Sequence, residues 1–259
     1  MNIVWVKLFY RVQTLFVFLQ KKMIAKKLGL LHSDYRIDLL RTMQSIRGSV
    51  ETADILIDIG ANQGDFSKIF ADIYHPSFII CIEPNSELNN DITANTKASK
   101  TVIVNKAISV QSGEMDFYFH SDTQMSSLFS SDSELIKKDF GEDDPEKTVI
   151  KKILVTTLDH VFEKYSVDIK GKSIFLKIDT QGNELEVIRS AANTMQHIQY
   201  CLLEYMFQTP YEKRYDFYEL VFLMGEHGFS CLGPMHASFR SNGQVGAVLF
   251  LFEKTKGKR

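Results

Sequence analysis

Five apolar runs recur along the chain, and none shows the strict alternation of apolar and polar residues that a half-exposed sheet requires. They span residues 55–60, 77–84, 101–108, 173–179 and 200–205. Strands of this kind are buried on both faces, and helix-length segments between them are typical of parallel pairing. The sequence therefore predicts an α/β domain, a doubly wound and mostly parallel sheet with helices on both sides.

Apolar residues recur at helical spacing in segments before, between and after these runs. We expect helices at residues 35–47, 66–74, 87–96, 182–194 and 213–226. Two strand-like segments, 113–121 and 151–158, fall between the third and fourth runs and predict an inserted antiparallel β-hairpin. The charged segment 131–148 between them is either a solvated excursion or a lid over a substrate. A last strand, predicted to be antiparallel, covers 246–254.

The N-terminal region is treated separately, because residues 3–19 are strongly hydrophobic. Lys7, Arg11 and Thr14 recur on one helical face, which favours an amphipathic helix over a membrane span or a signal peptide. Residues 1–30 contain Lys and Arg but no acid. This helix either packs on the domain or makes a peripheral contact with an anionic membrane. We divide the chain into a helical extension, 1–50, and a main domain, 51–259.

Composition narrows the class of function. The net charge of −2 gives no sign of a nucleic-acid partner. Cys81, Cys201 and Cys231 are scattered in apolar runs and predict reduced core residues of a cytoplasmic protein, held at the inner face of the membrane if the N-terminal helix binds there. The histidines show no metal-ligand spacing, so we expect no metal. Nothing in the sequence indicates an oligomeric state.

The stretch ILIDIGANQGDF predicts a ligand-binding turn after the first strand. A dinucleotide fingerprint would need glycine where Asn62 stands, and a P-loop would need a Lys followed by Ser or Thr. An acid followed by GxxxG remains, formed by Asp58, Gly60 and Gly64. This pattern suits a sulfonium cofactor without phosphate, whose carboxylate the amides of the turn would meet. Glu83 ends the second run, where an acid reaches ribose hydroxyls.

Several ordered motifs carry a family resemblance. DIGANQGDFS, IEPNSELNNDITAN, VTTLDHVF and FLKIDTQGNELEVIRSA resemble the FkbM family of S-adenosylmethionine-dependent methyltransferases. The resemblance covers about residues 55–252 and leaves out the first 50. It implies a class I, Rossmann-like methyltransferase fold, S-adenosylmethionine as the methyl donor, and methylation of a hydroxyl oxygen on a sugar, glycolipid or polyketide.

The resemblance also implies roles for individual residues. Asn105 and Ala107 would lie near the adenine, Glu83 would hold the ribose, and Asp179 would lie beside the transferred methyl group. Gln181 stands where the KIDxEG motif of the family often has Glu, and it cannot serve as a base. The methionine part of the cofactor would be held by Asp58, Gly60, Ala61, Asn62 and Gly64.

Catalytic candidates follow from the position of acids along the strands. Asp179 and Glu204 end the fourth and fifth runs, and the carboxyl ends of parallel strands are where ligands bind. Glu184, early in the following helix, either caps that helix or has a functional role at the site. Lys177 is expected to form a structural ion pair with Glu204 or Asp58, and the alternative is a direct catalytic role.

Three aromatic residues that follow Glu204 have two interpretations. Tyr205, Phe207 and Tyr211 either stack on a sugar acceptor or belong to the core.

Two other classes of function remain open at this stage. A nicotinamide-dependent oxidoreductase is disfavoured by Asn62 in the glycine pattern. A non-catalytic Rossmann-like binding protein is disfavoured by the presence of Asp58, Glu83 and Asp179. The sequence therefore predicts an S-adenosylmethionine-dependent O-methyltransferase that acts on a small-molecule or glycan acceptor.

Overall fold

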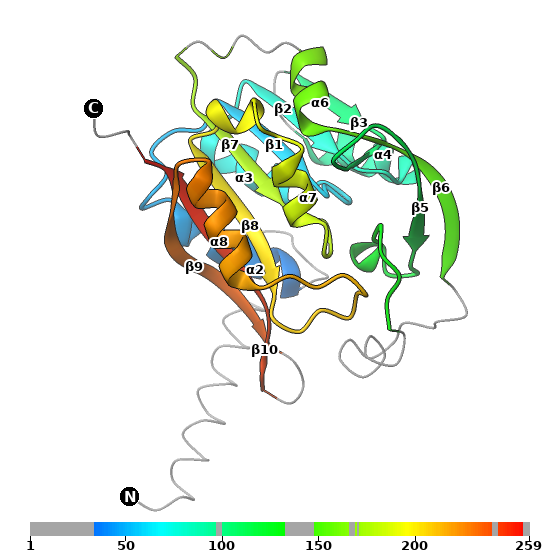
Figure 1. Ribbon diagram of the computed structural model, residues 1–259. Coiled ribbons are helices and arrows are strands. Elements are labelled where there is room, and N and C mark those ends of the chain that lie inside the picture. The colour runs from blue at the N-terminus through cyan, green and yellow to red at the C-terminus, as the bar shows by residue number, and fades with distance from the viewer. Residues whose placement is uncertain are drawn as a thin grey trace, which may run out of the picture.

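The computed structural model describes residues 34–96, 100–132, 148–165, 169, 171–239 and 243–255. Its core is a seven-stranded sheet (Figure 1), whose spatial order is β3 (Thr101–Val104), β2 (Phe78–Ile82), β1 (Ile55–Ile59), β7 (Ile174–Ile178), β8 (Tyr200–Met206), β10 (Val245–Lys254) and β9 (Phe229–Phe239). Neighbours from β3 to β8 pair in parallel, whereas β10 is antiparallel to both β8 and β9. The predicted fold class, including the antiparallel last strand, is confirmed.

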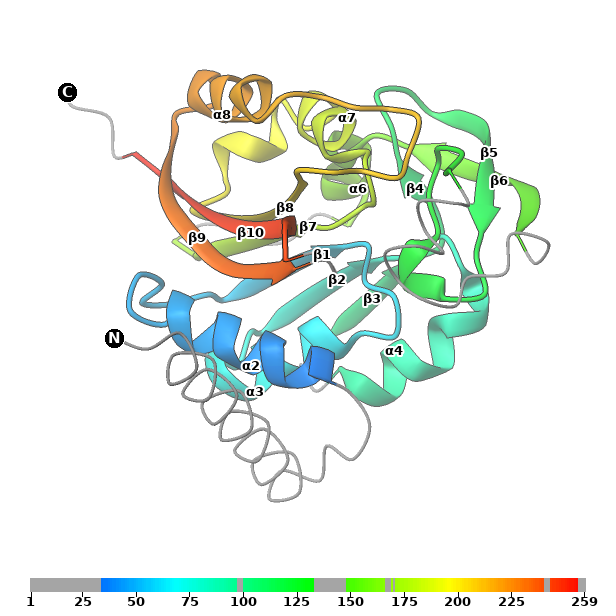
Figure 2. The same ribbon diagram turned by 90° about the horizontal axis from the view of Figure 1, so that it is seen from below.

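Helices cover both faces of this sheet (Figure 2). On one face lie α2 (Asp34–Ile46), α3 (Asp65–Tyr74) and α4 (Asn89–Asn95), and on the other lie α6 (Leu158–Lys164), α7 (Glu184–Arg189) and α8 (Phe217–Glu226). Each face has its own apolar cluster. Leu56, Phe175 and Leu202 face α2 and α3, while their chain neighbours Ile57, Leu176 and Leu203 face the other side. Because both faces are buried, the strands are continuously apolar.

The predicted third strand, 101–108, is in fact two strands in different sheets. β3 ends at Val104, and β4 (Ala107–Ile108) pairs with β6 (Val149–Thr156) in a three-stranded sheet that also contains β5 (Gly113–Phe119). Asn105 causes the break, because its side chain donates to the Glu83 carbonyl and pairs with the Asn89 amide. The predicted antiparallel pairing of β5 with β6 is confirmed.

Several predicted boundaries are wrong. The helix predicted at 182–194 ends at Arg189, and Thr194–Gln196 forms a separate 3-10 turn. Asp159 accepts the backbone N–H groups of Asn193 and Thr194 and so holds the chain in a turn there. The helix predicted at 213–226 begins only at Phe217. The strand β9 was not predicted, because Gly233 and Pro234 inside it are typical of turns, although an edge strand tolerates proline.

The N-terminal part of the described chain packs on the domain. α2 confirms the helix predicted at 35–47, and its residues Leu39, Met43 and Ile46 are buried in the cluster that also contains α3. The predicted helix at 3–19 and most of segment 131–148 lie outside the described residues, and the division of the chain at residue 50 stays a prediction. Within the described residues, no helix combines the length and apolar character needed to cross a membrane.

Gly60 lets the ends of two central strands meet. It follows β1 with φ of 75°, and a Cβ built on it would lie 1.8 Å from the carbonyl oxygen of Asp179 at the end of β7. No side chain fits there without moving the backbone. The close contact keeps the turn after β1 directly against the turn after β7, and the site is built around this contact.

We predict that Gly60→Ala destabilises the protein by more than about 1–2 kcal/mol, which is the cost of a left-handed backbone alone. Gly225→Ala is the matched control, because Gly225 is exposed near the end of α8 and its Cβ would meet nothing within 4 Å. This control should stabilise the protein by about 0.5–1 kcal/mol. Urea unfolding measures both changes, and equal midpoints for Gly60→Ala and the unmodified chain would contradict the prediction.

Candidate active site

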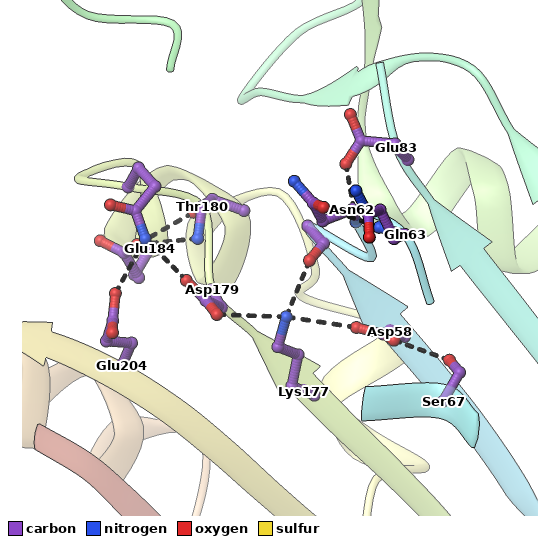
Figure 3. A network of polar contacts seen from close by, with 12 residues as sticks. Asp58, Asn62, Gln63, Ser67, Glu83, Lys177, Asp179, Thr180, Glu184 and Glu204 are labelled. Atoms are coloured by element: carbon purple, nitrogen blue, oxygen red, sulfur yellow. Dashed lines mark hydrogen bonds and ion pairs between the residues drawn. The ribbon is translucent and has the colours of Figure 1, made fainter. Parts of the chain in front are cut away.

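A buried lysine joins the two central strands at their carboxyl ends (Figure 3). The Lys177 ammonium donates to the Gly60 carbonyl at 2.8 Å and lies 3.3 Å from a carboxylate oxygen of both Asp58 and Asp179. Asp58 also accepts from the Ser67 hydroxyl at 2.7 Å. Asp58 and Lys177 are register partners on β1 and β7, so strand pairing alone places them together. The predicted pairing with Asp58 is confirmed, and the second partner is Asp179, not Glu204.

Asp58 occupies a different place from the one predicted. Its side chain is fully buried, and it does not line the cavity beside the turn. Its carboxylate faces Lys177 and Ser67 underneath the turn. A direct contact of Asp58 with a cofactor therefore does not follow from the geometry. Asp58 acts through Lys177, which in turn contacts Gly60 and Asp179.

The amides of the glycine turn are already used within the protein. Gly60 and Ala61 both donate to the Ile82 carbonyl, and Gly64 donates to the Ala61 carbonyl. The Asn62 amide donates to Glu83, and the Gln63 amide donates to the Asn62 side chain. The expectation that these amides meet a ligand carboxylate is therefore wrong. The N-terminus of α3 lies next to the turn, and its cap residue Gly64 provides no side-chain acceptor.

Glu83 is fixed at the end of β2. One carboxylate oxygen accepts the Asn62 amide and the other accepts the Asn85 amide, each at 2.9 Å. Burial raises the pKa of Glu83, while these two hydrogen bonds oppose the shift. A carboxylate has about four acceptor positions, so two accepted bonds leave room for more donors. Glu83 is therefore held in one orientation with acceptor capacity to spare.

A cavity of about 140 Å³, the first cavity, lies between these turns. The predicted site residues that line it are Gly60, Ala61, Asn62, Glu83, Ala107, Asp179 and Glu204. Gly64 packs against Ile92, and Asn105 supports the Glu83 backbone, so neither lines the cavity.

Sequence reasoning missed part of this lining. Ile108 and Phe117 come from the small sheet, and Thr123 accepts a hydrogen bond from the Asn62 side chain at 2.9 Å. Ile108 and Phe117 belong to segments that were predicted as strands, but their pattern does not say which cavity they face. Thr123 follows β5 in a segment without periodicity. Local sequence therefore carried no signal that places these three residues at the site.

Gln181 links the two candidate catalytic carboxylates. Its amide nitrogen donates to Asp179 at 2.9 Å and to Glu204 at 3.0 Å, and its oxygen accepts from the Tyr211 hydroxyl at 3.1 Å. Burial raises the pKa of Glu204 well above its ordinary value, and the nearby Asp179 and Glu184 raise it further. The structure therefore brings together Asp179 and Glu204, the two acids that the sequence places at strand ends. The amide bridges them without adding a charge.

Glu184 holds the turn that carries Asp179. One of its oxygens accepts the amides of Thr180 and Gly182 at 3.0 and 3.1 Å, and the other accepts the Tyr215 hydroxyl at 2.7 Å. It lines neither cavity at the site and is buried. Burial raises its pKa, and the bond from Tyr215 opposes the shift. Of the two interpretations of Glu184, the geometry supports the structural one.

Tyr205 near the end of β8, and Phe207 and Tyr211 beyond it, do not line the site. Tyr205 packs edge-on against Phe217, and Tyr211 is buried with its hydroxyl bonded to the Met125 carbonyl. Phe207 is half exposed and contacts the Tyr205 ring. None of the three predicted aromatics lines a described cavity at the site. The core interpretation applies to Tyr205 and Tyr211.

A second cavity of about 380 Å³ adjoins the first. The residues that line both are Phe66, Gln124, Lys177, Asp179, Gln181 and Glu204. The two carboxylates thus lie at the junction of two compartments. In the described part of the chain, no group of three or more His, Cys, Asp or Glu residues is placed to hold a metal.

Comparison with known proteins identifies the chemistry. The model of the "Methyltransferase FkbM domain" matches residues 58–231. The chain belongs to the FkbM methyltransferase family. It is therefore an S-adenosylmethionine-dependent methyltransferase, and the oxidoreductase and non-catalytic alternatives are set aside. No curated protein matches the chain in sequence.

Solved methyltransferase structures resemble the chain only distantly. Magnesium protoporphyrin IX methyltransferase from Synechocystis, with bound S-adenosylmethionine, is 8% identical with a TM-score of 0.44, covering 83% of this chain and 76% of that one. A candidate RNA methyltransferase from Pyrococcus horikoshii is 11% identical with a TM-score of 0.46, covering 93% and 98%. These likenesses identify no acceptor for this chain.

We predict that Glu184→Ala destabilises the protein by about 2–4 kcal/mol, because it leaves the buried donors of Thr180, Gly182 and Tyr215 without their acceptor. Glu184→Gln keeps an acceptor for the two amides and should cost less than about 1 kcal/mol. Unfolding in urea measures both.

The pH dependence of the free energy of unfolding gives a second test of the role of Glu184. The folded pKa of Glu184 is raised, so its contribution to stability falls as pH rises from the unfolded pKa through the folded one. Glu184→Gln should remove the part of the loss of stability at rising pH that Glu184 causes. An unchanged pH dependence in Glu184→Gln would contradict the assignment.

Proposed function

We propose that this methyltransferase transfers a methyl group to a hydroxyl oxygen of a sugar, glycolipid or related small molecule. The observation that supports the proposal is the bridged carboxylate pair, Asp179 and Glu204, at the junction of the two cavities. A hydroxyl must lose its proton as its oxygen is methylated, and a carboxyl with a raised pKa is a suitable acceptor for that proton. Bound S-adenosylmethionine supplies a methyl group on a sulfonium centre that is open to displacement.

The first cavity has features that fit the cofactor. The remaining acceptor positions of Glu83 would receive the ribose hydroxyls, and the apolar residues Ile82, Ala107 and Ile108 would flank the adenine. The start of α3, at Asp65 and Phe66, borders the same cavity, and the positive end of a helix favours the methionine carboxylate. Gly60 and Ala61 would contribute contact surface, because their amides are already bonded.

The two carboxylates have different surroundings and would have different roles. Asp179 is paired with Lys177 at 3.3 Å, which suits it to orienting the acceptor hydroxyl. Glu204 has no ion pair with Lys177 among the described contacts, and its raised pKa suits it to accepting a proton. Gln181 keeps both carboxylates in place through its amide.

The proposal is tested by Glu204→Gln and Asp179→Asn, which keep shape but remove the carboxylates. Loss of the base should lower kcat by roughly 10²–10⁴-fold. In the unmodified enzyme kcat should rise with pH as Glu204 loses its proton, and this rise should be absent in Glu204→Gln. Formation of S-adenosylhomocysteine with extracted glycans measures kcat, and mass spectrometry locates the added methyl group. Undiminished activity in both variants, or methyl groups found only on nitrogen or carbon, would refute the proposal.

Glu83→Ala tests the cofactor-binding site separately from catalysis. The variant removes acceptors for the ribose hydroxyls, and hydrogen bonds to a charged group contribute about 1.5–3 kcal/mol. We expect the Kd for S-adenosylhomocysteine to rise roughly 10–100-fold by calorimetry. Glu87→Ala is the control, because Glu87 is exposed outside both cavities. Equal affinities of the two variants for S-adenosylhomocysteine would exclude Glu83 from the cofactor-binding site.

A further inference from the structure

The second cavity is built in part from segments of the chain outside the region that the family model matches. The model ends at residue 231, whereas one side of the cavity comes from β9 and β10 through His236, Phe239, Ala247 and Leu249. The opposite side comes from Leu39 and Thr42 of α2, which precede the match at residue 58. Figure 2 shows α2 alongside β9. These walls therefore lie outside the residues that the family model matches.

The base of the cavity is apolar up to the carboxylate pair. Leu202, Glu204 and Met206 alternate along β8 and face the same side, toward α2. Across the antiparallel ladder, Leu249 lies opposite Glu204, and Ala247 lies opposite Met206. A ligand whose hydroxyl reaches Glu204 would thus lay its remaining length on Leu249, Ala247 and Met206. This surface favours hydrocarbon over a chain of further hydroxyls.

Two polar side chains at the outer end, those of Ser238 and Gln208, already have partners. Ser238 bonds the backbone of Ala247 in both directions, at 3.1 and 3.3 Å. Gln208 donates to the Gln244 side chain at 2.8 Å. Beside them, the Phe239 ring is 67% exposed. The opening of the cavity therefore presents a large apolar side chain next to polar groups that have partners.

Charge argues against a polyanionic acceptor. Among the described residues that line the second cavity, Lys177 is the one Lys or Arg, and it is paired with Asp58 and Asp179. Nucleic-acid binding depends on Lys and Arg that neutralise phosphates. Asp179 and Glu204 at the inner end would instead repel phosphate oxygens. The lining is matched to an uncharged ligand with hydroxyls at one end and hydrocarbon at the other.

We propose that the second cavity binds an uncharged amphiphile, a hydroxylated head group at Asp179 and Glu204 with an alkyl chain running over Leu249 and Ala247 toward Phe239. This rests on the proposed function, because it names the class of acceptor for the same site. It assigns α2 and the β9–β10 pair to acceptor selection. Simple sugars would bind weakly, since the hydrocarbon surface would stay uncovered.

The test compares two glucosides with the same head group, n-octyl β-D-glucoside below its micelle concentration and methyl β-D-glucoside. Binding to the full chain saturated with S-adenosylhomocysteine is measured by calorimetry. Burial of even two methylene groups contributes about one factor of ten in affinity, so the octyl compound should bind at least tenfold tighter. Equal affinity of the two glucosides would overturn the proposal.

Two exposed phenylalanines provide the matched variants. Phe239→Ser should reduce the octyl preference at least threefold and leave the affinity for S-adenosylhomocysteine unchanged. Phe222→Ser changes another exposed ring, on α8, which is 54% exposed and lies outside the cavity, and this change should leave the preference intact. An octyl preference that Phe239→Ser does not alter, or that Phe222→Ser reduces as much, would place the alkyl chain elsewhere and overturn the proposal.

The outcomes also separate this proposal from the proposed function. An octyl preference that depends on Phe239, without methyl transfer to any hydroxyl, would support the amphiphile site and contradict hydroxyl methylation. Methyl transfer to glycan hydroxyls, with equal binding of both glucosides, would support hydroxyl methylation and contradict the amphiphile site. Binding is measured with the product form of the cofactor, so the readout does not depend on turnover.

Discussion

The site depends on one buried ammonium group. Lys177 contacts an oxygen of Asp58, of Gly60 and of Asp179, and these three groups come from the ends of two adjacent parallel strands. A buried charge without partners is strongly unfavourable, and removing one member of a buried pair costs about 3–5 kcal/mol. The ammonium therefore holds the turn after β1 against the turn after β7. The orientation of Asp179 and the shape of the first cavity both follow from this contact.

The same ion pairs give two neighbouring carboxyl groups, those of Asp179 and Glu204, different properties. Lys177 is shared by Asp58 and Asp179, whereas desolvation, and after it the neighbouring Asp179, raises the pKa of Glu204. Gln181 then donates to both acids. A glutamate at this position would add a third carboxylate and remove the donor. An amide suits a site in which one acid is ion-paired and the other accepts a proton.

Sequence reasoning succeeded where the information is local or repeats along a strand. Continuous apolar runs identified the strands, and the shared face of Lys177 and Asp179 follows from the side-chain period of two. It failed on the turn amides, because whether a backbone N–H is free depends on the carbonyl of Ile82 and the carboxylate of Glu83, which reach the turn only after β2 has paired with β1. It also missed β9, whose glycine and proline are tolerated only because the strand lies at a sheet edge.

The sequence by itself determined the layered α/β architecture, the methyltransferase family, and the acids that end the central strands. Each of these is recorded in the order and spacing of nearby residues. Only the tertiary structure decided which acids line a cavity and what surrounds them. The second cavity joins α2 to the far end of the chain because β10 inserts between β8 and β9, and α2 packs across that edge. Contacts between such distant segments depend on the order of strands in the sheet, which no local pattern specifies.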